Sequence, residues 1–266
     1  MTVHQRPALF FVFAFVILSG GQAASADGET APTYDGMPSG KRDYAAFVEL
    51  WDDFLYWRDP KSARKEQSLV DVAGLETDVY PDFGAEAMTA RLQQLRKFQG
   101  ELDEFAVTDW PVRHQVEFLA VRAKMDEEEF TLRVSKPWSR DPGFYVDRML
   151  RPTFTELPLE GAALTDFERR LDAIPGLAAQ GKANLVDVAA DYADLAIFNL
   201  SNSDGVGHGF PYRAEPPAGV VGWYDDLLQR ARDTQPELEE RIQTAKSAVE
   251  SFRDWLSANR SEMTAD

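Results

Sequence analysis

The chain has 266 residues, and 44% of them are hydrophobic, including 17 Phe and 6 Trp. This supply of apolar side chains is enough for a core and excludes a globally disordered chain. The formal charge is −17, with 45 acidic residues against 28 basic ones and no run rich in Lys or Arg. Because such a chain repels phosphate backbones, nucleic acid is excluded as a partner.

Residues 1–26 have the three-part layout of a secretory signal peptide. Arg6 supplies the positive charge, Ala8 to Leu18 form the apolar run, and Ala24-Ser25-Ala26 is a cleavage signal. We expect cleavage before Asp27, which makes the mature protein periplasmic or secreted and free of the membrane. The alternative is an uncleaved anchor, but a membrane span needs about 20 apolar residues. Without cysteine, the chain has no disulfides and no lipid-attachment site of the lipoprotein kind.

Residues 27–40 are polar and rich in Gly and Pro, so we expect a flexible lead-in there. A single all-helical domain is predicted over 41–260, followed by a short tail at 261–266. The spacing of apolar residues predicts three helices in the first part of the domain. Pro60 is expected to end the first, and Asp109, with Pro111 in the first turn, to begin the third. The predicted core-facing stripes are Tyr44, Phe47, Val48, Trp51, Phe54 and Leu55; Met88, Leu92, Leu95, Leu102 and Phe105; and Val112, Val116, Leu119, Ala123, Phe130 and Val134.

Three further helices are predicted in the second part of the domain. Thr165 can cap one that holds Phe167 and Leu171, and Leu185, Val188, Tyr192 and Leu195 belong to another. Pro236 opens the last, whose apolar residues form a heptad seam: Leu238, Ile242, Ala245, Val249, Phe252 and Leu256. The seam favours a long helix packed antiparallel on its neighbour over a dimerising coiled coil, which usually needs a longer seam. The predicted fold class is all-α, a helical bundle or array of long amphipathic helices with two irregular Gly/Pro-rich loops.

The two loops, Ser135 to Arg148 and Ser201 to Gly219 with its lead-in from Ile197, hold the candidate site residues. These are Arg140, Asp141, Tyr145, Asn199, Asp204, His208, Tyr212 and Arg213. Structural roles are an alternative for some of them. Asp141 can cap the next helix with Pro142 in the first turn, while Trp138, Phe144 and Tyr145 pack that helix start against the core. His208 can equally be a hydrogen-bonding strut.

Recognisable catalytic chemistry is missing from the sequence. His114 and Glu117 are spaced to share one helix face, but a lone pair of this kind is typical of a solvated helix surface. The acidic run Asp126 to Glu129 is likewise typical of a solvated face. There is no His-Glu-x-x-His motif, no calcium loop, no nucleophile elbow and no phosphate-binding loop. We therefore assign no catalytic residue, no metal ligand and no cofactor to this chain.

Four segments, taken together and in order, resemble the bacterial domain-of-unknown-function family 885. They are "FVELWDDFLYWRDP", "VEFLAVRAKMDEEEFTLRVSKPWSRDPGFYVD", "FERRLDAIPGLAAQGKANL" and "SNSDGVGHGFPYRAEPPAGVVGWYDDLLQRA". Lys136 stands where the family's Arg-Pro-Trp-x-Arg-Asp-Pro segment has Arg. The resemblance covers Asp43 to Leu256, and it corresponds to the N-terminal half of a family whose members are mostly helical and about twice this length.

The resemblance implies a protein related to zinc metallopeptidases. In that family the metal motif lies in the second half, so zinc is implied only for full-length members, and the two loops here would line the substrate channel. Three interpretations remain: a truncated or split member that is not catalytic alone, a stand-alone peptide- or protein-binding module, and a hydrolase with an unrecognised site. The expected partners are a missing C-terminal half, a second copy of the chain, or a peptide.

A half-domain should leave apolar surface uncovered. We expect that surface to include the final seam, Leu238 to Leu256, together with Phe210, Tyr212, Trp223 and Tyr224.

Overall fold

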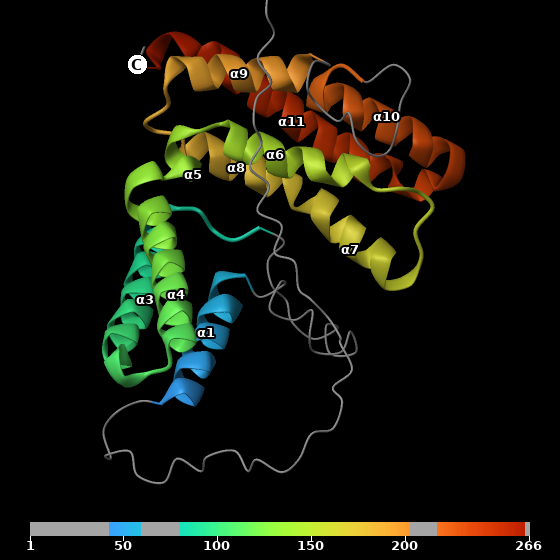
Figure 1. The fold of residues 1–266 in the computed structure, drawn as a ribbon. Coiled ribbons are helices and arrows are strands. Elements are labelled where there is room, and N and C mark those ends of the chain that lie inside the picture. The colour runs from blue at the N-terminus through green and yellow to red at the C-terminus, as the bar shows by residue number, and fades with distance from the viewer. Residues whose placement is uncertain (1–42, 60–79, 203–216, 264–266) are drawn as a thin grey trace, which may run out of the picture. The chain divides into compact units, whose positions relative to one another are not determined.

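The computed structural model describes residues 43–59, 80–202 and 217–263, all within one compact unit, Gly40–Asp266. Within these ranges every regular element is helical and none is a strand, so the all-α prediction is confirmed (Figure 1). Among the described helices, none is both long and apolar enough to cross a membrane.

The first three helices are α1 (Tyr44–Arg58), α3 (Ala85–Asp103) and α4 (Val112–Phe130), with a 3-10 turn, η2 (Val107–Asp109), before α4. Asp43 caps α1 by accepting a hydrogen bond from the backbone N–H of Ala46. Aromatic rings from all three helices form the core between them: Phe47, Phe54, Phe98 and Phe118 are each at most 8% exposed. The α1 and α3 stripes were thus predicted largely correctly, with Val48 of α1 as an exposed exception.

The segment Tyr80–Gly84 attaches this group to the later helices. The Tyr80 hydroxyl donates to the backbone oxygen of Arg148 at 3.0 Å, and the Phe83 N–H donates to Gln180 Oε1 at 3.1 Å. The Phe83 ring meets Phe144 edge-on, with 4.8 Å between centroids. A second connection between the first three helices and the later ones is the end of α4. This helix continues into a π-helical turn, η3 (Thr131–Ser135), which ends at Lys136. Lys136 ends the turn in the left-handed region, with φ +40°.

The middle of the chain folds into short helices: α5 (Pro137–Arg140), α6 (Gly143–Leu150), the 3-10 turn η4 (Arg151–Phe154), α7 (Gly161–Asp172) and α8 (Ile174–Asn184). Gly181 lets α8 approach its neighbours closely. A Cβ at this position would lie 2.8 Å from the ring of Phe252 and 3.1 Å from that of Tyr145. Two bulky rings can therefore pack directly against the α8 backbone.

The last helices are α9 (Ala190–Ser201), α10 (Gly219–Thr234) and α11 (Glu239–Asn259), with 3-10 turns η5 (Pro236–Leu238) and η6 (Arg260–Glu262) around α11. Figure 1 shows α11 alongside α8, α9 and α10, which all contact it. The predicted seam from Leu238 to Leu256 is completely buried. It packs against helices of the same chain, as the antiparallel interpretation predicted.

This burial overturns the expected uncovered surface. The seam residues, Trp223 and Tyr224 are all 0% exposed. Helices α8, α9 and α10 contact α11, which carries most of the seam, and α10, which carries Trp223 and Tyr224, contacts α9, α11 and η4. The Tyr224 hydroxyl also donates to the backbone oxygen of Met149 at 2.8 Å. Phe210 and Tyr212 lie outside the described residues.

Three predicted helix boundaries were wrong. Asp109 lies in the 3-10 turn, and α4 begins at Val112 with Pro111 as its extended cap residue. Helix α7 begins at Gly161, so Thr165 lies inside it and donates to the Gly161 carbonyl instead of capping.

The predicted helix from Leu185 to Leu195 is the third error, because α8 ends at Asn184 and α9 begins only at Ala190. Leu185 and Val188 are buried in the link between these two helices, while Tyr192 and Leu195 point outward. The buried face of α9 consists instead of small residues and one leucine: Ala190, Ala193, Ala196 and Leu200.

Candidate binding surface at the α8–α9 link

The first predicted loop lies against the link between α8 and α9. The backbone oxygen of Ser139 accepts hydrogen bonds from the N–H groups of Val186 at 3.2 Å and Asp187 at 3.1 Å. The guanidinium of Arg140 lies 3.3 Å from the carboxylate of Asp187, and both side chains are about half exposed or more. Arg140 therefore lies at the surface, where its ion pair with Asp187 adds to the two backbone hydrogen bonds that Ser139 accepts from the link.

Asp141 has the capping role that was its structural alternative. Its Oδ1 accepts a hydrogen bond from the Gly143 N–H at 2.8 Å, at the start of α6, and Pro142 adopts helical angles in between. Asp141 therefore binds the first N–H of α6 as predicted, although the helix begins at Gly143 and Pro142, not Asp141, is its cap residue. The short carboxylate is engaged by the backbone and stands only partly exposed.

Tyr145 is a core residue, which corrects its place among the candidate channel residues. The side chain is 0% exposed. Its hydroxyl donates to the Trp138 carbonyl at 2.7 Å and accepts from Asn184 Nδ2 at 3.3 Å. Burial raises the pKa of the Tyr145 hydroxyl to about 12. Tyr145 thus joins α5, α6 and α8 together and presents no group to a channel.

Asn199, in the lead-in to the second predicted loop, lies on α9, whereas Arg140 lies on α5. Asn199 is half-buried near the end of α9, and nine residues of helix separate it from Ala190. That helix length corresponds to about 14 Å. The other candidates in the second loop, Asp204, His208, Tyr212 and Arg213, lie outside the described residues.

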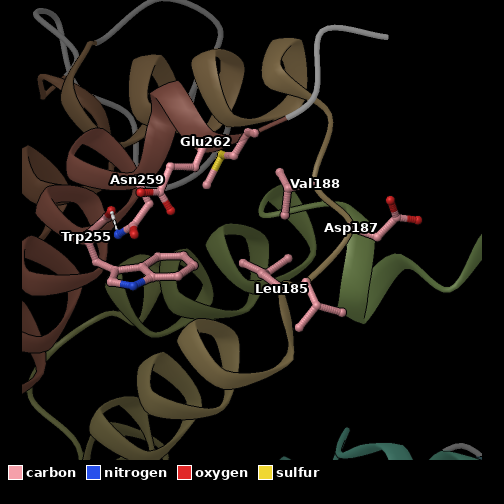
Figure 2. Close-up of a pocket in the computed structure, with 8 residues that line it drawn as sticks. Leu185, Asp187, Val188, Trp255, Asn259 and Glu262 are labelled. Carbon is pink, nitrogen blue, oxygen red and sulfur yellow. Dashed lines mark hydrogen bonds between the residues drawn. The ribbon is translucent and has the colours of Figure 1, made fainter.

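A shallow pocket of about 220 Å³ opens beside the link. Its lining residues are Leu185, Val186, Asp187, Val188, Trp255, Asn259, Glu262 and Met263. Figure 2 shows Trp255, Asn259 and Glu262 on one side and Leu185 and Val188 on the other, with Asp187 pointing away from Trp255. The Asn259 amide is fixed by donating to the Trp255 carbonyl at 2.8 Å.

The pocket combines an indole, apolar side chains and the carboxylate of Glu262. Such a combination suits a ligand with an aliphatic stem and a positive end, because the ring and Leu185 bury the stem while the carboxylate neutralises the charge. The volume suits one such side chain. Sequence reasoning missed this pocket, since Trp255 and Glu262 come from the final helix and turn, and only folding brings them next to Leu185.

The His114 and Glu117 pair has a structural explanation. The His114 ring stacks on Tyr44 with centroids 3.6 Å apart. Glu117 accepts a hydrogen bond from the Tyr44 hydroxyl and another from Arg113 at 3.0 Å. The hydrogen bond between Tyr44 and Glu117 raises the pKa of the tyrosine and lowers that of the carboxyl. In the described ranges no three His, Asp or Glu side chains are grouped closely enough to hold a metal ion.

The acidic run at the end of α4 is only partly a solvated face. Glu128 lies 3.5 Å from Arg58 and 3.1 Å from Arg91, and its side chain is 15% exposed. Arg91 also lies over the ring of Trp57, 4.5 Å from its centroid. Glu128 therefore joins α4 to both α1 and α3, a role that the local sequence did not indicate.

Two apolar surfaces were also missed. On α4 and the turn η3 that follows it, the predicted core stripe faces outward: Val112, Val116, Leu119, Phe130 and Val134 are 45–76% exposed, and Ala123 is exposed with them. We call these six residues the α4 face. On α9, Tyr192, Leu195 and Phe198 are 41–57% exposed and form the α9 face.

The helix period accounts for the error on α4. Its core contacts come from Phe118, Val121 and Met125, which lie on the opposite side of the helix at about 100° per residue. The sequence of α4 contains two apolar stripes, a pattern that indicates burial on both sides of the helix. The described helices bury only one of them.

Comparison with known proteins gives information about the fold only. Neither a family model nor a curated protein sequence matches this chain. A solved structure described as "a putative lipoprotein of unknown function from Shewanella oneidensis" is similar, with a TM-score of 0.58 and 17% sequence identity. The similarity covers 83% of this chain and 38% of that one. The fold described here therefore also occurs as part of a chain more than twice as long.

Proposed function

We propose that this chain is an exported, non-catalytic helical module of the domain-of-unknown-function 885 family, the counterpart of the N-terminal half of a metallopeptidase-like protein. In this proposal the α8–α9 link, with its pocket and the neighbouring α9 face, is the side that meets peptide or the second half. The observation that carries it is the fold similarity, which spans most of this chain but 38% of a longer one.

Three further observations support this proposal. Four sequence segments resemble segments of that family, in the same order. The exposed apolar residues of the α9 face offer a surface for another protein part, since monomeric proteins rarely expose large apolar patches. The N-terminal 26 residues have the signal-peptide layout, and the similar structure is itself described as a lipoprotein, a class of exported proteins.

A second candidate function is a stand-alone peptide-binding module, which the pocket favours. Trp255 and Glu262 would accept one basic side chain of a peptide, without any catalysis. The two candidates share the same surface and differ in whether a metal-bearing half is needed.

The pocket can be tested by calorimetric titration of the mature chain with the peptides Ala-Lys-Ala and Ala-Glu-Ala, blocked at both ends. We expect weak binding of the lysine peptide only, because the carboxylate of Glu262 attracts the ammonium group. Glu262→Gln should raise the Kd about fivefold, the loss of an exposed ion pair. Glu237→Gln, which changes another exposed glutamate, in η5, is the matched control and should not change the Kd. Equal binding of both peptides, or equal effects of both variants, would argue against the pocket.

A further inference from the structure

Five residues of the α4 face, together with Asp126 between them, have the spacing of a helix-pairing surface. Positions 112, 116, 119, 123, 126 and 130 alternate steps of four and three, which is the pattern of a heptad seam. Asp126 is the one charged residue in that series. The series extends over about 27 Å of helix. Its apolar members are exposed although α4 already buries Phe118, Val121 and Met125 on its other side.

We infer that the α4 face binds a second copy of this chain, with the two α4 helices antiparallel. The inference does not rest on the proposed function, which concerns the α8–α9 link. It rests on the exposed seam, on the local charge and on the position of Asp126.

The net charge around α4 is close to zero, so it does not prevent a second copy of the chain from binding there. Residues 112–134 contain four basic and five acidic side chains, whereas the chain as a whole carries −17. One of the five acids, Glu128, is already held between Arg58 and Arg91. Two copies can therefore meet along α4 without opposing two strongly negative surfaces, and charges farther away are screened beyond about 8 Å at physiological salt.

Asp126 decides between the two possible orientations. In a parallel pair each seam residue meets its own counterpart, so the two Asp126 carboxylates would face each other in an apolar interface. In an antiparallel pair centred next to Lys124, Leu119 faces Phe130 of the other copy and Asp126 faces Ala123. Arg122 and Asp126 lie on the same flank of the seam, and antiparallel helices bring like flanks together.

The antiparallel arrangement thus places Arg122 beside Asp126 of the other copy, twice in each dimer. In the single chain Arg122 lies 3.6 Å from Asp103, with both side chains more than half exposed. It is therefore free to turn toward a partner at little cost. Opposite charges beside apolar contacts, here those of Leu119 with Phe130 of the other copy, are the arrangement that specifies helix pairing.

Sedimentation of the mature chain over a wide concentration range tests the pairing. We expect a monomer–dimer equilibrium in which Leu119→Glu raises the Kd about 30-fold or more, as for a residue at the centre of an interface. Leu195→Glu on the α9 face is the matched control, because this leucine is 57% exposed against 61% for Leu119. It should leave the Kd unchanged, and circular dichroism checks that both variants keep their helix content.

Charge exchange tests the orientation. Arg122→Asp should weaken the dimer, and adding Asp126→Arg to the same chain should restore it, since each new pair again has opposite signs.

Cysteine crosslinking gives a second test of the orientation. The chain has no cysteine, so single introduced cysteines report contacts without background. With a short thiol crosslinker, Ala123→Cys should form covalent dimers. Val112→Cys should not, because antiparallel helices hold the two copies of this position about 37 Å apart.

A monomer at every concentration would overturn the inference, and so would a dimer that Leu195→Glu disrupts and Leu119→Glu does not. Crosslinking through Val112→Cys would overturn the antiparallel orientation. A monomer at every concentration and crosslinking through Val112→Cys leave the pocket and the zinc content untouched, so they are separable from a failure of the proposed function. A dimer that depends on Leu195 would instead assign self-association to the α9 face.

Discussion

Replacing Gly219 with alanine is expected to lower the free energy of unfolding by about 3 kcal/mol. Two effects combine at this position. Gly219 has φ +67°, in the left-handed region that disfavours residues with a Cβ. A Cβ there would also lie 2.6 Å from the Leu200 carbonyl carbon and the Ser201 nitrogen. These are backbone atoms of α9, so they cannot rotate out of the way as a side chain could.

Gly161→Ala is the matched control for the steric part of this effect. Gly161 has φ +56°, but nothing lies within 4 Å of the position where its Cβ would be. It should therefore show only the conformational cost, about 1 kcal/mol. Urea unfolding followed by circular dichroism measures both values. Equal losses in the two variants would mean that the contact between the added Cβ and the backbone at the end of α9 costs no free energy of unfolding.

Raising the pH from about 9 to about 13 is expected to remove close to 3 kcal/mol of stability through Tyr145. The tyrosine hydroxyl has an ordinary pKa of 10.0, and burial raises the pKa of Tyr145 to about 12 in the folded protein. Between these values the unfolded chain has released the proton while the folded chain retains it. The folded state therefore gains stability from Tyr145 below pH 10 and loses it as the pH rises through 12. Tyr224, fully buried, has its pKa raised for the same reason and adds to the loss.

Denaturation at a series of alkaline pH values measures this loss. Tyr145→Phe should be less stable than the parent chain at pH 8, because the hydrogen bonds to Trp138 and Asn184 are lost. Its stability should nevertheless fall less steeply above pH 10, since one titrating group is gone. Parallel pH curves for the two proteins would show that Tyr145 titrates at its ordinary pKa, as an exposed channel residue would.

Much of the helix content followed from periodicity, and the final helix shows why. Its apolar residues from Leu238 to Leu256 lie on a single side of the helix, and that side is buried. One stripe therefore predicted both the helix and the face that packs in the core. The cap at Asp141 was predictable for a similar reason. The Asp-Pro-Gly sequence limits the backbone locally, and the carboxylate finds the Gly143 N–H without help from distant residues.

Periodicity misled where burial depends on distant partners. Helix α4 has apolar residues on two sides, and the pattern alone does not say which side meets α1 and α3; Phe118 does, and Leu119 does not. Helix α9 packs through Ala193 and Ala196, which carry little hydrophobic signal but let other helices approach closely. The outward Tyr192 and Leu195 gave the stronger signal and were assigned to the core.

The candidate site was the least predictable part. Arg140 and Asp187 are 47 residues apart in the sequence, and the pocket needs Trp255 and Glu262 as well. For Tyr145 the structural alternative was correct and the channel assignment was wrong, since the side chain is buried and its hydroxyl bonds to Trp138 and Asn184. Both outcomes depend on contacts between elements that no local pattern encodes.

The zinc content of the purified mature chain tests most directly whether it is a non-catalytic module. The His114 ring is stacked on Tyr44, and Glu117 is bound by Tyr44 and Arg113, so this pair offers no open metal site. Elemental analysis after dialysis, with and without prior zinc loading, should find no stoichiometric zinc, and a mixture of unstructured peptides should remain uncleaved. About one zinc per chain, lost on His114→Ala or His208→Ala and accompanied by peptide cleavage, would contradict this account.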